Sequence, residues 1–323
     1  MHEERRGRTT VRPHPVVLAQ FGVLATVWGA SFLFIKVGLR RLSPTQVTSA
    51  RVWFGALTLV GIAAVRRRPL PRSLAVYGHL LVVALLLCVL PFTLFAYGET
   101  RISSGLASII NATTPLLTMA FASVFLASER PTAVRLAGLA LGFAGVLVVF
   151  APWRGVGSGS LVGELACLGA TACYGAAFVY LRRFVMPLRL DPVTVALVQV
   201  GLAAVVLLVA APFLSAHPVH VTWPVLGSML ALGILGTGLA YVMNTNVVAG
   251  LGATAASTVT YLTPVVGVVL GVAVLGERIS WNEPVGGLVV IAGIVLGQGL
   301  LRPGRPLRTS HRPTTSQRGD RTG

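Results

Sequence analysis

Long apolar runs separated by short polar or basic loops dominate the hydropathy pattern of this chain. A helix needs about 20 apolar residues to cross a bilayer, whereas a membrane β-barrel is built from alternating segments of about 10 residues. The runs fit the first description, so the pattern predicts an all-α integral membrane protein. Ten transmembrane helices are expected, at residues 16–37, 46–65, 74–96, 104–127, 133–151, 161–181, 192–214, 223–247, 252–275 and 283–301.

The composition agrees with a membrane location. Hydrophobic residues make up 54% of the chain and charged residues 11%, against about 25% charged residues in soluble domains. The net charge of +17 could indicate nucleic acid, but the arginines lie in short loops and in two tails, where they orient a helical membrane protein. We therefore expect no nucleic-acid partner, and a multi-pass protein of the cell membrane with both termini cytoplasmic. Residues 1–15 and 302–323 are expected to be disordered basic tails.

The second half of the chain repeats the first. Ala107-Ser108 and Ala256-Ser257 are each followed, seven residues after the serine, by a proline and later by Glu-Arg. The spans at 16–37 and 161–181 share an aromatic-Gly-x-x-Phe pattern that begins at Trp28 and Tyr174. Matching positions are offset by 146 to 149 residues. Because five spans are an odd number, the second copy must run upside down relative to the first, which is the plan of inverted-repeat carriers.

These motifs resemble the EamA-type branch of the drug/metabolite transporter superfamily. The resemblance covers roughly residues 16–301 and implies two inverted five-helix repeats, 16–151 and 161–301, joined by a linker at 152–160. It further implies a central cavity and the export of small polar metabolites, especially amino acids or their derivatives, with drugs as a further class. Two positions depart from the pattern: Tyr174 stands where the family more often has Trp, and Gln199 stands where the first half has Arg51.

Polar side chains within spans are costly, so they are candidates for the cavity wall. The candidate substrate-binding residues are Trp28, Ser31, Arg51, Ser108, Asn111, Tyr174, Gln199, Tyr241, Asn244, Ser257 and Tyr261, and the candidate helix kinks are Pro115 and Pro264. A guanidinium suits a substrate carboxylate, although Arg51 could equally reach the lipid headgroups. Serine and threonine could instead bond to their own helix, and amides could join helices.

The remaining charged residues favour structural roles. Lys36 is expected to anchor a helix at the interface, and Glu99 could pair with Arg101. Glu129 and Glu277 are expected to pair with arginine or with neighbouring helix ends. Glycines spaced as small-xxx-small steps predict close helix packing.

The sequence contains no catalytic constellation, no phosphate-binding glycine loop and no metal-like spacing of Cys88, Cys167 and Cys173. We therefore expect no enzyme activity, no cofactor and no metal. The hypothesis is a secondary transporter that moves a small molecule by alternating access, and proton coupling and a homodimer stay open. The alternatives are a membrane-embedded enzyme, which would need clustered acids or histidines, and a channel, which would not exchange solutes in counterflow.

Overall fold

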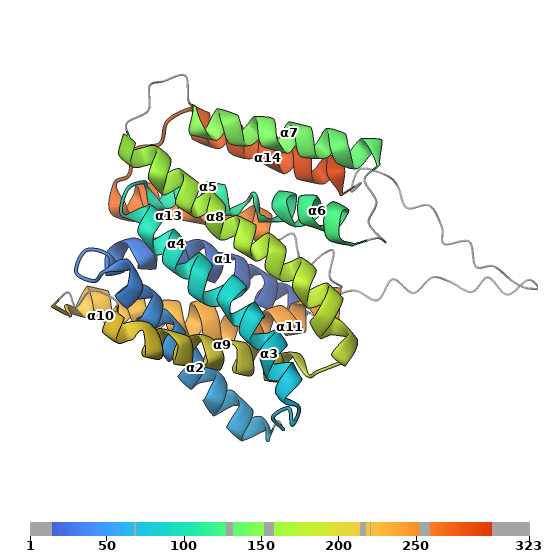
Figure 1. Cartoon of the computed structure of the whole chain (residues 1–323). Helices are drawn as coiled ribbons and strands as arrows, with labels where there is room; N and C mark the ends of the chain where they lie inside the picture. The colour runs from blue at the N-terminus through green and yellow to red at the C-terminus, as the bar shows by residue number, and fades with distance from the viewer. Residues whose placement is uncertain are drawn as a thin grey trace, which may run out of the picture.

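The computed structural model describes residues 15–67, 69–126, 132–151, 158–213, 218–219, 221–251 and 259–298. Every regular element in these ranges is a helix (Figure 1). Eight helical stretches are long and apolar enough to cross a membrane, and two shorter apolar helices, Val259–Leu275 and Asn282–Gly297, complete the predicted set. The chain therefore has the ten-helix organisation expected from its sequence.

The first five spans contain eight helical segments, because two of the spans are divided. They are α1 (Pro15–Gly38), α2 (Pro44–Arg66), α3 (Leu74–Ala84) continuing through η1 (Leu85–Val89) into α4 (Leu90–Glu99), α5 (Ser104–Asn111), α6 (Thr114–Phe125) and α7 (Ala133–Phe150).

The last five spans follow the same order. They are α8 (Ser158–Tyr180) with η4 (Leu181–Val185) and η5 (Met186–Leu188), α9 (Pro192–Ala210) with η6 (Ala211–Phe213), α10 (Trp223–Leu230) continuing through η7 (Ala231–Leu239) into α11 (Ala240–Leu251), α13 (Val259–Leu275) and α14 (Asn282–Gly297).

Helices α2 and α9, the second span of each half, begin in the same way. The Ser43 hydroxyl accepts a hydrogen bond from the backbone N–H of Gln46, and the Asp191 carboxylate accepts from the N–H groups of Val193 and Thr194. A proline follows each cap, where its fixed φ suits the first helical turn. The repeat seen in the sequence thus sets equivalent helix starts.

Helices α7 and α14 show directly that the halves are inverted. They lie side by side at one edge of the molecule (Figure 1). A Cβ added to Gly138 would lie 2.4 Å from the Cα of Gly297, and one added to Gly293 would lie 2.4 Å from the N of Gly142. Residue numbers rise along one helix as they fall along the other, so these equivalent spans are antiparallel. The glycines provide the close backbone approach predicted for small-xxx-small steps.

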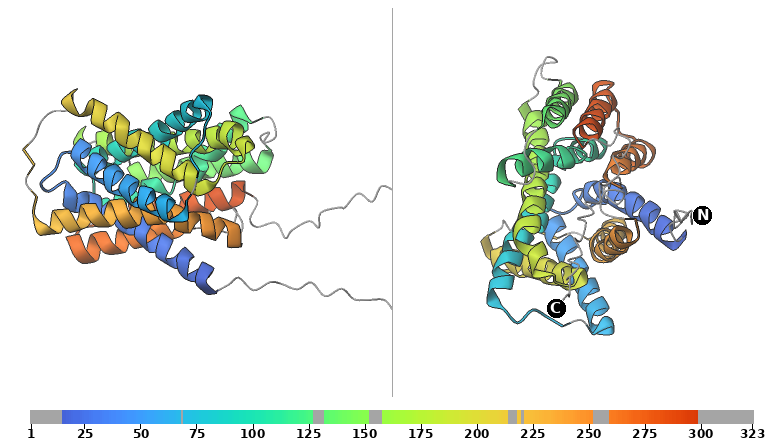
Figure 2. Two further views of the ribbon diagram at one scale, coloured as in Figure 1. Left: turned by 90° about the horizontal axis from the view of Figure 1, so that it is seen from below. Right: turned by 90° about the vertical axis from the view of Figure 1, so that its right-hand side faces the viewer.

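The other contacts between helices repeat under exchange of the two halves. Helix α1 packs against α13 as α8 packs against α6, and α4 packs against α8 as α11 packs against α1. The glycine of each aromatic-Gly motif permits one of these contacts: Gly29 lies against the Thr263 carbonyl and Val266, and Gly175 lies against Leu117 and Thr118. The bundle therefore has an internal pseudo-two-fold axis, and Figure 2 shows its helices from two further sides.

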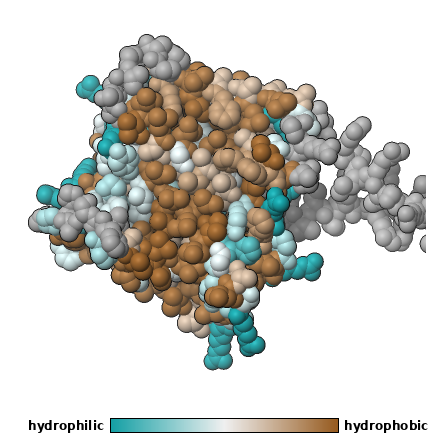
Figure 3. Space-filling view, in the orientation of Figure 1, coloured by the Kyte–Doolittle hydropathy of each residue, from teal (hydrophilic) through white to brown (hydrophobic). Residues whose placement is uncertain are grey.

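The surface has the distribution expected of a bilayer protein. An apolar band crosses the face shown in Figure 3, and hydrophilic residues gather on both sides of it. Large apolar side chains such as Leu57, Leu147, Leu208 and Leu288 are more than half exposed. A surface of this kind is stable only in contact with lipid.

Several spans differ from the predicted boundaries, and the span predicted at 161–181 continues to Leu188. The span predicted at 104–127 is divided, because α5 ends at Asn111 and α6 begins at Thr114. Pro115 lacks an N–H and cannot continue the hydrogen-bond ladder of α5. The span predicted at 74–96 continues to Glu99, whose side chain is 1% exposed. The prediction placed Glu99 at the outer end of this span, and the structure includes it in the last turn of α4.

Candidate substrate site

A buried arginine lies where the second and third spans meet the eighth. Arg51 of α2 is 9% exposed, and its Nε donates a hydrogen bond of 3.1 Å to Oγ1 of Thr237 in η7. Its Cζ lies 3.7 Å from the ring centroid of Phe92 in α4. The two Nη atoms form no hydrogen bond with any described residue. A guanidinium has five N–H donors in a rigid fork, so the side chain that is held at Nε still presents donors for a carboxylate.

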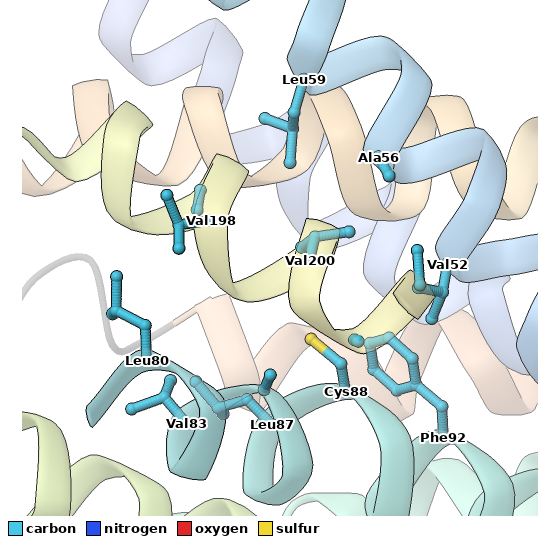
Figure 4. Close-up of a cluster of buried hydrophobic side chains, with 14 of the residues drawn as sticks. Val52, Ala56, Leu59, Leu80, Val83, Leu87, Cys88, Phe92, Val198 and Val200 are labelled. Carbon is cyan, nitrogen blue, oxygen red and sulfur yellow. The ribbon is translucent and has the colours of Figure 1, made fainter. Parts of the chain in front are cut away.

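Four further ionisable groups act electrostatically on the guanidinium: Cys88, Tyr174, Tyr241 and, further along α4, Glu99. The Cys88 Sγ lies 3.9 Å from the Tyr241 hydroxyl, and both residues, together with Tyr174, lie within electrostatic range of Arg51. Cys88 and Phe92 project from one face of the third span toward Val52 of α2 and Val200 of α9 (Figure 4). We call Arg51, Cys88, Tyr174, Thr237 and Tyr241 the central polar cluster.

The backbone is irregular on both sides of this cluster. The third span contains the π-helical segment η1, and the eighth contains the π-helical segment η7. Cys88 in η1 and Thr237 in η7 occupy equivalent positions in the two halves. π-helical turns are rare in proteins, and those that do occur often lie at functional sites. Equivalent irregularities beside one buried arginine support this place as the functional centre.

The structure brings together some of the predicted site residues. Arg51, Tyr174 and Tyr241 belong to the central polar cluster. Gln199 lies on α9, which packs against α2; it is 2% exposed, and its amide bonds to no described residue. Trp28 does not belong to the central polar cluster and packs instead in an apolar cluster with Leu24 and Ala240.

Other predicted residues have structural partners of their own. The Ser31 hydroxyl donates to the carbonyl O of Val27 and the Ser108 hydroxyl to that of Gly105, so both bond within their own helix. The Tyr261 hydroxyl donates to the Gln298 side chain after α14, away from Arg51. For these residues the structure favours packing over substrate contact.

The remaining predicted positions are not assigned a role by their contacts. Asn111 ends α5 and Asn244 lies in α11; both are partly exposed, and neither amide bonds to a described residue. Helix α13 runs through Pro264 without interruption, unlike the fourth span at Pro115. Ser257 lies outside the described residues.

Two expectations about charged residues are wrong. Lys36 does not reach the lipid headgroups, because its Nζ donates to the backbone carbonyls of Glu99, at 2.6 Å, and Ile102, at 2.7 Å. Arg101 does not pair with Glu99: its guanidinium lies 3.9 Å from the Tyr97 ring centroid and donates to the Tyr97 carbonyl and the Thr100 hydroxyl. We call this region, where α4 ends and α5 begins, the Lys36 end of the bundle.

A groove of about 490 Å³ opens near the opposite end of α2, between α2, α3 and α9. Arg67 and Tyr77 contribute to its wall, and the other lining residues are apolar. This groove is separate from the central polar cluster.

Sequence reasoning missed Thr237, Phe92 and Cys88 as members of the site. Thr237 lies in a run of glycine and leucine, and cysteines in spans were interpreted only as small apolar residues. The offset of 149 residues between Cys88 and Thr237 matches the repeat, but every position of the first half has such a partner, so the sequence did not single out this pair.

The fold and this site define a class: helical membrane transporters built from inverted repeats. The sequence profile of the EamA-like transporter family matches residues 18–151 and again residues 161–297. The chain therefore belongs to the EamA-like transporter family and is a multi-pass membrane transporter.

Known transporters of similar length resemble the chain over most of their sequence. The chain is 26% identical to the uncharacterized inner membrane transporter YedA of Escherichia coli K12, over 90% of this chain and 95% of that protein. It is 26% identical to the uncharacterized transporter YoaV of Bacillus subtilis 168, over 87% and 97% of the two chains. A crystal structure with 18% sequence identity and a TM-score of 0.62 covers 90% of this chain and shows the same fold.

Proposed function

We propose that the chain exports small polar metabolites, amino acids or their derivatives among them, across the cell membrane by alternating access. The observation that carries this proposal is Arg51: a buried guanidinium, fixed at Nε by Thr237, with both Nη atoms unengaged by described residues. Such a group is suited to a substrate carboxylate. Apolar groups of the substrate would meet Phe92, Tyr174 and Tyr241.

The inverted repeat supports the transport mechanism. Because the two halves are related by a pseudo-two-fold axis, rocking one half against the other exchanges the environments of equivalent helices. The π-helical segments η1 and η7 and the break before Pro115 would allow local bending beside the central polar cluster. The positively charged loops favour cytoplasmic termini.

Counterflow tests the proposal directly. The purified chain is reconstituted into liposomes loaded with unlabelled L-amino acids, and uptake of each labelled amino acid is measured against empty-vector liposomes. Arg51→Lys and Arg51→Gln should lose exchange of carboxylate-bearing substrates, while Arg101→Gln, at an exposed arginine outside the central polar cluster, should retain it at equal protein content. Exchange unaffected by Arg51→Gln would contradict the site, and flow without exchange would indicate a channel.

A further inference from the structure

A buried carboxyl group at the Lys36 end has no hydrogen-bond partner among the described residues. Glu99 is 1% exposed, and neither Oε1 nor Oε2 accepts a hydrogen bond there. Native proteins satisfy nearly all buried polar atoms, so an orphaned carboxyl group needs a physical explanation. An ionised carboxylate without partners is very costly inside a membrane protein, whereas a protonated one is neutral.

The Lys36 ammonium acts electrostatically on this carboxyl group but forms no hydrogen bond with it. The Lys36 ammonium donates to the main-chain carbonyls of Glu99 and Ile102 instead. These carbonyls lie at and just beyond the C-terminus of α4, where a positive charge is favourable. Lys36 therefore stabilises the end of the helix and donates no hydrogen bond to either carboxyl oxygen of Glu99.

The other ionisable groups that face Glu99 form no hydrogen bond with its carboxyl oxygens, and this includes Arg51, whose Nη atoms bond to no described residue. On α2, Arg51 donates its Nε to Thr237; after α13, the Glu277 carboxylate already accepts three hydrogen bonds from Ser104 and Gly105. On α8, Cys167 is fully buried and packed against Gly98. These groups and Lys36 are the ones that act electrostatically on Glu99 among the described residues. None supplies a hydrogen bond to its carboxyl oxygens.

Glu99 is nevertheless connected to the central polar cluster through one helix face. Phe92, Phe95 and Glu99 lie on α4 at spacings of three and four residues, so they share a face. Phe92 contacts the Arg51 guanidinium, and the Phe95 ring centroid lies 6.0 Å from that of Tyr174. Beyond them, Phe32, Ile102 and Leu106 form an apolar cluster with Phe95 at this end of the bundle.

We propose that Glu99 is a proton-binding site of this transporter, protonated while the Lys36 end is closed and deprotonated when that end opens to water. On opening, the O–H bond of the carboxyl group breaks and the proton passes to water. The carboxylate that remains is hydrated and can pair with Lys36 as α4 and α5 separate. The second half of this cycle rests on the proposed function, because it requires alternating access; proton binding in the closed form does not.

Infrared spectroscopy of the purified full-length chain tests whether Glu99 is protonated while the Lys36 end is closed. The carbonyl stretch of a protonated carboxyl group is separate from the carboxylate and amide bands. Wild type should show this band at neutral pH and lose it as the pH is raised toward about 10, since buried glutamates can retain protons to about pH 8–9. Glu99→Gln should lose the part of the band that Glu99 contributes, Glu99→Asp should shift that part, and Arg101→Gln should leave the whole band unchanged. An identical band in wild type and Glu99→Gln would overturn the proposal, as would its absence from wild type.

A transport measurement separates this proposal from the proposed function. Proteoliposomes containing a pH-sensitive dye are loaded with a mixture of the L-amino acids and diluted into amino-acid-free buffer, and net efflux and internal pH are followed together. Exchange is measured separately with amino acids on both sides, because balanced exchange moves no net protons. Wild type should move protons with substrate, and Glu99→Gln should keep exchange but lose proton movement. Net efflux without proton movement in wild type would contradict release on opening. If wild type shows no exchange, the proposed substrate class fails, while the infrared result still decides whether Glu99 binds a proton.

Discussion

The carboxylate of Glu277 closes the N-terminus of helix α5 through Ser104. It accepts hydrogen bonds from the Ser104 backbone N–H at 2.8 Å, from the Ser104 hydroxyl at 2.9 Å and from the Gly105 N–H at 3.1 Å. Gly276, with φ of 66°, turns the chain back after α13 so that Glu277 can reach this helix end. The Glu277 carboxylate that follows the fourth span of the second repeat therefore caps the fourth span of the first.

Removing this cap should lower stability. Glu277→Ala leaves two backbone N–H groups and a hydroxyl without their charged acceptor, and hydrogen bonds to charged groups contribute about 1.5–3 kcal/mol each. We expect a clear drop in the melting temperature of the detergent-purified protein and a smaller drop for Glu277→Gln, which keeps one acceptor oxygen. Arg278→Ala, at the exposed neighbouring residue, is the control. Equal melting temperatures for Glu277→Ala and Arg278→Ala would refute the capping role.

The contact between α7 and α14 depends on glycine. A Cβ at Gly293 would lie 2.4 Å from the backbone N of Gly142, which cannot move aside as a side chain could. Gly293→Ala should therefore separate the helices and destabilise the fold by about 1–3 kcal/mol, the usual range for overpacking. Gly61→Ala in α2 meets open space and should be neutral or slightly stabilising because alanine favours the helix. Thermal unfolding of both variants in the same detergent measures the difference, and matched melting temperatures would count against this packing.

The hydroxyl of Thr237 should matter to transport through Arg51. Thr237→Val keeps the shape of the side chain but removes the acceptor for Arg51 Nε, so the guanidinium is free to turn toward another partner. We expect exchange of carboxylate-bearing substrates to fall about tenfold, as for one lost charge-assisted hydrogen bond of about 1.4 kcal/mol. Thr58→Val is the matched control, because the Thr58 hydroxyl bonds to its own helix at Phe54. Equal exchange rates in these two variants would remove Thr237 from the site.

The sequence predicted the helical membrane class and the inverted halves because both follow from patterns that repeat along the chain. Apolar runs of bilayer length predict spans, and the Ser43-Pro44 and Asp191-Pro192 starts become equivalent caps. The contacts that a long side chain makes with other helices are harder to predict. Hydropathy placed Lys36 at the lipid interface, but the position of α4 and α5 relative to α1 decides that it reaches two carbonyls.

The local sequence also does not predict the π-helical segments of the site or the burial of Glu99. Nothing in the apolar sequence of η1 or in the Gly-rich sequence of η7 indicates a π-helical turn, which arises from the fit between packed spans. Glu99 was expected at the outer end of the third span, where it could pair with Arg101, and only its burial reveals an unpartnered carboxyl group. The sequence could therefore suggest Arg51 as a ligand, but it could not select its neighbours.

Asn111 and Gln199 test whether unpartnered amides line the transport path. Neither side chain bonds to a described residue, so Asn111→Ala and Gln199→Ala remove no internal hydrogen bond among those residues. Membrane abundance should stay near the wild-type level, whereas flux should fall several-fold if the amides contact substrate, each hydrogen bond contributing about 1 kcal/mol. Ser108→Ala, which loses only a bond within its own helix, provides the comparison. Flux and abundance are measured on the same membranes, because a loss of flux that merely follows abundance reports folding. Unchanged flux in both amide variants would remove Asn111 and Gln199 from the path and leave Arg51 as the principal polar contact.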